Sequence, residues 1–221
     1  TDLGAMQKEL QPHMMAPEGF SYKELLSETD YALLDSTLTA TLGVGLDLYG
    51  SMHPAALNMM YTVMVNNKVM EEEGIIAGMS IDEYVQKEGI KQGKEVAGLE
   101  TIDDQVYALF YAETPENQLK MLMASVENPD YAVESAKLLN KYYQERDLDK
   151  LYDLAFNNPD DPEPMSEEMA YAINKERNDA WMKKLPGMMS ANRCFVAVGA
   201  LHLAGEEGLV NQLRQLGYKV T

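Results

Sequence analysis

The sequence predicts an α/β protein, predominantly helical, with a small sheet that includes a C-terminal strand-helix-strand unit. Two observations lead to this fold class. Apolar residues recur at helical spacing through most of the 221-residue chain. Near its end, the uninterrupted apolar run Cys-Phe-Val-Ala-Val at 194–198 is typical of a strand buried on both faces. The strands expected in the sheet are 95–98, 193–199 and 218–220.

Caps and breakers delimit the expected helices. Ser21 can cap a long helix whose apolar positions run from Leu25 to Leu42, where two glycines end it. Pro54 and Pro115 suit the first turns of two further helices. Breaks are expected at 128–130 and 157–162, both rich in Asn, Pro and Asp.

His202 is the first candidate for chemistry. It ends the step Gly199-Ala200-Leu201-His202, directly after the expected strand 193–199. Leu209, Leu213 and Leu216 follow at helical spacing and Gly217 can end that helix, so strand, helix and strand would form a right-handed crossover. His202 would then emerge at a strand's carboxyl end, where open α/β sheets place ligands. It is either a metal ligand or acid/base group, or a hydrogen-bonded structural histidine.

Glu100 lies at a second expected strand-to-helix junction. Thr101 is a good helix cap, with Asp104 three residues on and Gln105 in the first turn. The Glu100 carboxylate could anchor backbone amides, or it could act as a base or ligand.

Arg177 interrupts an apolar stripe. Met165, Met169, Ile173, Arg177, Trp181 and Leu185 are spaced four apart, so the guanidinium falls on an otherwise apolar helix face, flanked by Glu176 and Asn178. A charge on an inward face needs a partner, since an unpaired ion in an apolar setting costs several kcal/mol, roughly. The alternatives are a structural ion pair and a charge directed into a site.

Composition excludes some partners. The chain has 36 acidic and 18 basic residues and a net charge of −18, which argues against nucleic acid and anionic membrane surfaces. No apolar stretch reaches the roughly 20 residues of a membrane span. Cys194 is the single cysteine, so neither an internal disulfide nor a thiolate metal cluster is expected. Because the chain begins at Thr1, we expect a fragment or a processed product.

These motifs occur in a recognisable order. Gly98-Leu99-Glu100-Thr101 with Gln105, then Glu176-Arg177-Asn178, then Gly199-Ala200-Leu201-His202 with the residues around it, strongly resemble the TraB/GumN family. That family is grouped with the Tiki proteins and, more remotely, with erythromycin-esterase and ChaN-like proteins. The resemblance implies one domain over 1–221 that lacks its amino-terminal strands and the first of the family's two Gly-x-x-His motifs.

The resemblance also implies a function: a metal-dependent hydrolase of peptide or ester bonds, associated with the periplasm or cell envelope. The metal would be a divalent ion of unknown identity, with His202 as a ligand. Glu100, Arg177 and His202 would be the catalytic residues, Arg177 stabilising developing negative charge. Gln105, Glu176, Asn178 and Gly199 would be binding residues. The alternatives are a non-catalytic protein that binds a peptide signal, haem or another small molecule, and a purely structural role for these residues.

Overall fold

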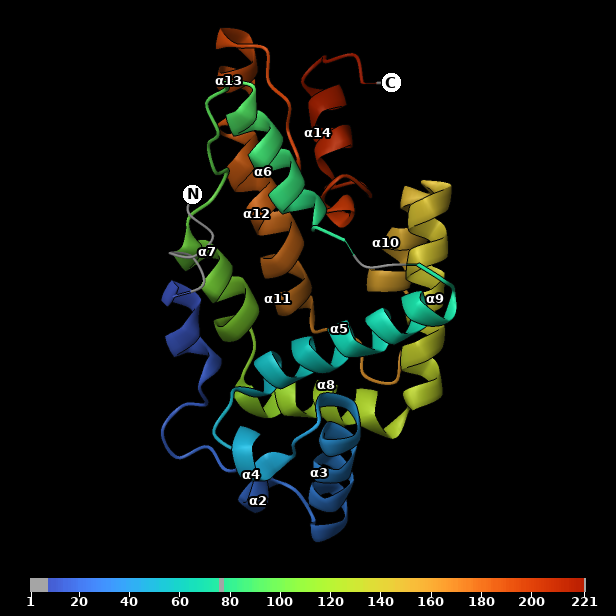
Figure 1. The fold of residues 1–221 in the computed structure, drawn as a ribbon. Helices are drawn as coiled ribbons and strands as arrows, with labels where there is room; N and C mark the ends of the chain where they lie inside the picture. The colour runs from blue at the N-terminus through green and yellow to red at the C-terminus, as the bar shows by residue number, and fades with distance from the viewer. Residues whose placement is uncertain (1–7, 76–77, 221) are drawn as a thin grey trace.

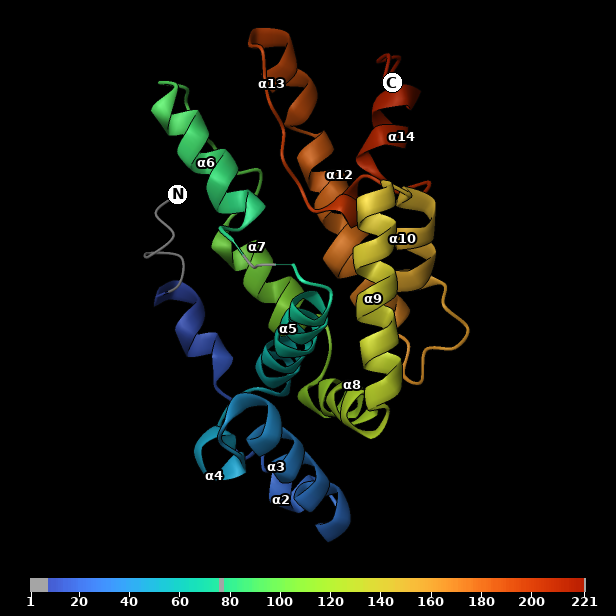
Figure 2. The same cartoon turned by 45° about the vertical axis from the view of Figure 1, so that its right-hand side comes forward.

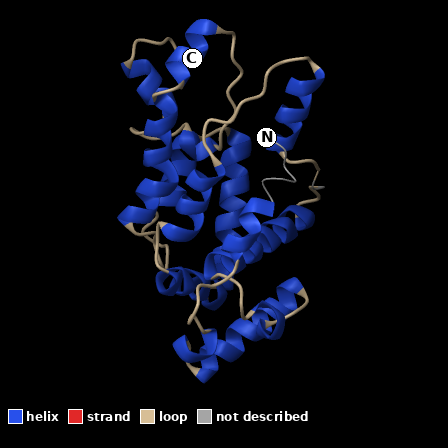
Figure 3. Ribbon diagram, turned by 90° about the vertical axis from the view of Figure 1, so that its left-hand side faces the viewer, coloured by secondary structure: helices blue, strands red, loops and turns tan. Residues whose placement is uncertain are grey.

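A computed structural model describes residues 8–75 and 78–220. It is 67% helical, and an isolated antiparallel bridge between Met15 and Met52 is the β-pairing found within these two ranges. Helices joined by loops account for the whole architecture that Figure 3 shows.

The first half of the chain forms the lower part of the molecule in Figure 1 and a column that rises from it. Helix α5 packs on α3 and α8. The elements in order are η1 (Gln11–Met14), α2 (Tyr22–Leu25), α3 (Glu28–Leu42), α4 (Leu46–Tyr49), α5 (Pro54–Glu72), α6 (Ile81–Lys91), α7 (Ile102–Val106), the π-helix η2 (Tyr107–Tyr111) and α8 (Pro115–Glu127).

The second half forms two further columns. In one, α9 lies beside α10 (Figure 2), and in the other α11 is continued by α12 (Figure 1). Helix α9 also packs across α5, which ties the two halves together. The elements are α9 (Pro129–Glu145), α10 (Leu148–Phe156), α11 (Glu167–Ala170), the π-helix η3 (Tyr171–Lys175), α12 (Glu176–Met182), α13 (Leu185–Ala191), η4 (Ala200–His202) and α14 (Leu209–Gln215).

Several predicted helix ends are confirmed. Pro54 and Pro115 lie in the first turns of α5 and α8, and Gly43 ends α3 with φ +85°. The long helix expected from Ser21 is instead divided, because Ser27 caps a new helix by accepting the Asp30 N–H.

The core consists of separate clusters of apolar side chains. The largest joins α3, α5 and α8 through residues such as Leu38, Leu57 and Leu122, all 0% exposed. Another joins α12, α13 and α14 through Trp181, Leu185 and Leu209. The partly buried Leu99, Val198 and Leu203 pack against this second cluster, which brings the sequence motifs together.

The predicted small sheet is wrong. Residues 193–198 form no regular element and no backbone–backbone hydrogen bond, and Phe195 is 80% exposed. Segments 95–98 and 218–220 are irregular as well. An apolar run predicts burial, but a strand needs a neighbouring strand to pair its N–H and C=O groups, and none lies alongside within the described ranges.

Only the helix of the expected strand-helix-strand unit forms. It is α14, and Gly217, with φ +87°, follows it as expected. His202 therefore lies not at the end of a strand but at the end of a short 3-10 turn, η4. Within 8–75 and 78–220, no helix is long and apolar enough to cross a membrane.

Candidate functional site

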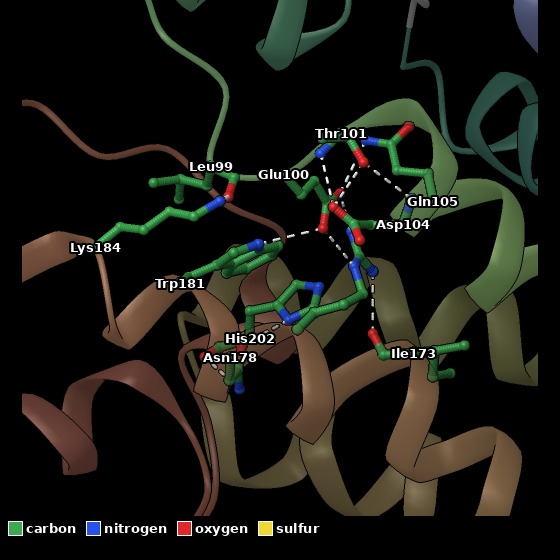
Figure 4. A network of polar contacts seen from close by, with 11 residues as sticks. Leu99, Glu100, Thr101, Asp104, Gln105, Ile173, Asn178, Trp181, Lys184 and His202 are labelled. Carbon is green, nitrogen blue, oxygen red and sulfur yellow. Dashed lines mark hydrogen bonds and ion pairs between the residues drawn. The ribbon is translucent and has the colours of Figure 1, made fainter.

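One network of polar contacts joins α7, η3, α12 and the loop around η4 (Figure 4). It contains five of the seven residues predicted for the site: Glu100, Gln105, Arg177, Asn178 and His202. Trp181 connects its two parts, because its indole N–H donates to Glu100 while its ring packs against His202.

The Glu100 carboxylate accepts hydrogen bonds from three side chains. Arg177 donates from Nε to Oε2 at 2.8 Å and from its terminal nitrogen Nη2 to Oε1 at 2.7 Å. Gln105 Nε2 donates to Oε1 at 2.9 Å, and Trp181 Nε1 to Oε2 at 3.2 Å. A carboxylate has about four lone-pair sites. All of them are therefore used, and none is left for a metal ion or a proton in transfer.

Local helix structure places this carboxylate. Thr101 caps α7 by accepting the Asp104 N–H, and the Asp104 side chain accepts the Thr101 N–H in return. Glu100 directly precedes this capping box, and Lys184 holds the residue before it by donating to the Leu99 carbonyl at 2.9 Å.

Glu100 stays ionised at neutral pH. Burial by itself would raise the pKa of its carboxyl, but the hydrogen bonds from Arg177, Gln105 and Trp181, with the charge of Arg177, outweigh burial and lower that pKa below its ordinary value. The side chains of Glu100 and Arg177 are 10% and 23% exposed. This arrangement favours the structural ion pair among the alternatives for both residues.

His202 is buried, with 8% of its surface exposed. Its Nδ1 lies 2.8 Å from Asn178 Oδ1. The Asn178 amide nitrogen donates to Asn174 Oδ1 and to the carbonyls of His202 and Glu207, at 3.1, 3.4 and 3.0 Å. Because that nitrogen faces three acceptors, the amide oxygen must face His202, so we assign the proton to Nδ1 and the lone pair to Nε2.

The imidazole of His202 is neutral at physiological pH. Burial first and the positive charge of Arg177 second lower its pKa, the negative charge of Glu100 opposes them in part, and the net result is a fall from 6.5 to about 4. The Trp181 ring centroid lies 4.5 Å from that of His202, so the indole covers one side of the imidazole. Nε2 has no hydrogen-bond partner among the described residues, yet it is not among their fully buried unpaired atoms, so it keeps contact with solvent.

Two asparagines one helical turn apart hold the loop that carries His202. Asn174, 6% exposed, donates to the Leu201 carbonyl at 3.0 Å, and Asn178, 0% exposed, donates to the carbonyls of His202 and Glu207. Sequence reasoning missed Asn174 and the indole donor of Trp181. The i, i+4 spacing of Asn174 with Asn178, and of Arg177 with Trp181, was the available signal.

The remaining two predicted residues differ. Gly199 lies beside the network, where an added Cβ would be 3.6 Å from the His202 ring, an ordinary contact. Glu176 is exposed and lines a separate cavity.

The loop held by the asparagines lines a larger cavity of about 1200 Å³. Its other walls are the turn between α9 and α10, which contains Arg146 with φ +58°, and the face of α14 that carries Arg214. Charged residues of both signs surround it, including Asp149 and Glu206.

The described residues do not by themselves suit a divalent metal. No group of three or more His, Cys, Asp or Glu side chains among them is arranged to hold an ion. His202 Nε2 is the kind of nitrogen that metals bind, with its other ring nitrogen fixed by a second residue. Glu100, for which the role of a ligand was one of the alternatives, has no free lone pair.

Comparison with protein families agrees with the motifs. The model of the TraB/PrgY/gumN family matches residues 1–221, so the chain belongs to this family and the resemblance inferred from the sequence is confirmed at that level. Neither a curated protein nor a solved structure matches the chain.

Proposed function

We propose that the chain is a hydrolase of peptide or ester bonds in which His202 orients the attacking water and accepts its proton at Nε2. One observation carries this proposal: Asn178 fixes the Nδ1 proton, which leaves an unpaired lone pair on a neutral imidazole. A base held in one orientation by a third group is the arrangement found in many hydrolytic sites. Membership of the TraB/PrgY/gumN family is consistent with it.

The proposed reaction consumes one water molecule for each bond that is cleaved, and His202 ends the cycle in its starting protonation state. The water oxygen forms a bond to the carbonyl carbon while its proton moves to His202 Nε2. The bond to the leaving nitrogen or oxygen then breaks, and the leaving group takes the proton back from Nε2. No step is assigned to a metal, because Glu100 has no free lone pair.

Arg177 has a secondary role in this proposal. A guanidinium has five N–H groups. Three of them donate to Glu100 and to the Ile173 carbonyl, which leaves two for the developing oxyanion. Since its charge is balanced by Glu100, its contribution is a directed hydrogen bond rather than a net positive field.

Peptide and ester turnover by the whole chain tests the proposal. Quenched-fluorescence peptides and p-nitrophenyl esters would be compared for the wild type, His202→Ala and the control His13→Ala, whose histidine lies elsewhere and bonds Tyr111. We expect His202→Ala to lower kcat/KM by about 100-fold or more, since a positioned base contributes roughly that factor. Wild-type turnover in His202→Ala would contradict the assignment.

The cavity beside the His202 loop favours a second candidate, a protein that binds peptides without turnover. At about 1200 Å³ it is large enough for several residues of a peptide. Saturable binding of a peptide that is recovered intact, together with no turnover in the first assay, would select this function.

A further inference from the structure

A second, smaller cavity lies outside the polar network, between two π-helical segments. η2 and η3 contact each other, and the cavity of about 350 Å³ at this contact is lined by residues of α11, η2, η3 and the start of α12. π-Helical turns within longer helices are rare and occur often at functional sites. Residues of both π-helical segments line this one cavity.

Two tyrosines and two alanines are among the residues that line it. Tyr107 and Tyr171 are 51% and 49% exposed, so their rings are available to a ligand. Ala112 and Ala172 line the cavity as well. The Ala112 N–H donates to the Tyr107 carbonyl at 2.9 Å, and this five-residue π-helical turn brings Tyr107 and Ala112 onto one face of the helix.

The charge of the cavity has a single sign. Glu167, Glu168 and Glu176 line it, all three are exposed, and none forms an ion pair with another described residue. The nearest lysine in sequence, Lys175, is directed away to Asp179 and Glu207, at 2.7 and 3.2 Å. No lysine or arginine of the described ranges lines the cavity, and the chain carries a net charge of −18.

The spacing of the carboxylates distinguishes the class of cation. A bare metal ion needs several oxygens within about 2.6 Å of one point. The three glutamates are not grouped closely enough for that, since no three His, Cys, Asp or Glu side chains among the described residues are placed to hold one ion. An organic cation is larger, and the faces of tyrosine rings attract it directly.

We propose that this cavity binds the ammonium or guanidinium group of a lysine or arginine side chain of a peptide. The tyrosine rings contact the cation and its alkyl stem, and the glutamates provide the counter-charge. The volume of about 350 Å³ suits one side chain, not a longer peptide. This site is independent of His202 and of the proposed hydrolysis.

Calorimetric titration of the full chain with N-acetyl-arginine amide and N-acetyl-lysine amide tests the proposal, with the neutral N-acetyl-norleucine amide as the matched ligand. We expect one-to-one binding of the two cationic ligands, weakened about fivefold or more by Tyr171→Leu and by Glu168→Gln. Tyr171→Phe keeps the ring and should retain binding. Urea midpoints of all variants establish that each is folded.

A control separates this site from general attraction by an acidic protein. Glu116→Gln removes one exposed carboxylate from α8, outside the cavity, and so reduces the net negative charge by the same amount as Glu168→Gln. Equal affinities of the two glutamine variants would overturn the proposal, because the cation would then respond only to total charge. Equal binding of the norleucine and arginine ligands would overturn it as well.

Discussion

Acid should destabilise this protein through His202. The imidazole is buried neutral against Trp181, and its pKa falls from 6.5 to about 4. In the unfolded chain the same group binds a proton near pH 6.5, so the unfolded state gains protons first as the pH falls. Stability contributed by neutral His202 is therefore complete above pH 6.5 and is lost as the pH falls toward 4.

The size of this effect follows from the shift. A difference of 2.5 pKa units corresponds to about 3.4 kcal/mol, since one unit is about 1.4 kcal/mol. Between pH 7 and pH 5, linkage predicts a loss of about 2 kcal/mol from this group alone. Glu100 contributes to a different window: its pKa is lowered, so its stabilisation is lost only below its ordinary value of 4.5.

Urea unfolding at pH 7, 6 and 5 measures the effect, with His202→Gln as the comparison. A neutral glutamine cannot take up the proton, so the variant should lose about 2 kcal/mol less than the wild type between pH 7 and pH 5. Burial also lowers the pKa of His53, but this contribution is present in both proteins and cancels in the difference. Parallel pH dependences in the two proteins would refute the burial argument for His202.

Three further outcomes follow from the geometry. Arg177→Met should lower the free energy of unfolding, measured by urea denaturation, by about 3 kcal/mol, because it leaves a half-buried carboxylate without its main partner. Gly205→Ala should cost about 2 kcal/mol, since φ is +77° and a Cβ would meet an aromatic ring at 2.7 Å, whereas Gly199→Ala should change stability by less than about 0.5 kcal/mol. Asn178→Asp should raise the pKa of His202, followed by NMR titration of the imidazole protons, because it places an anion 2.8 Å from Nδ1. An unchanged pKa would contradict the assigned contact.

Helices were predictable from the sequence where a local signal defines them. Proline in the first turns of α5 and α8 and the glycine after α3 act within a few residues of themselves, so the printed sequence contains all that decides them. The irregular structure of 193–199, where a strand was expected, was not predictable in this way. Whether an apolar run becomes a strand depends on a partner elsewhere in the chain, and its composition does not identify that partner.

In the candidate site, too, features set by local sequence were predictable and features set by distant contacts were not. The interrupted apolar stripe correctly predicted that Arg177 has a partner, because an unpaired buried charge is costly. The sequence could not show that Glu100 would fill all its lone pairs with donors from Arg177, Gln105 and Trp181. That result depends on the contact between two helices, α7 and α12, and neither segment's sequence alone predicts this contact.

Adjacent positions on α12 explain how a charged ion pair and a neutral imidazole lie in the same network. Arg177 and Asn178 are about 100° apart around the helix, so the first reaches Glu100 before α7 and the second reaches the loop of His202. Arg177 and Glu100 cancel each other's charge, while Asn178 orients His202 with an amide, which brings no charge of its own. An aspartate in that place could also accept the Nδ1 N–H, but it could not donate to the carbonyls of the loop and would favour the protonated imidazole. The use of an amide therefore preserves an oriented imidazole whose free nitrogen remains unprotonated, the state that a proton acceptor requires.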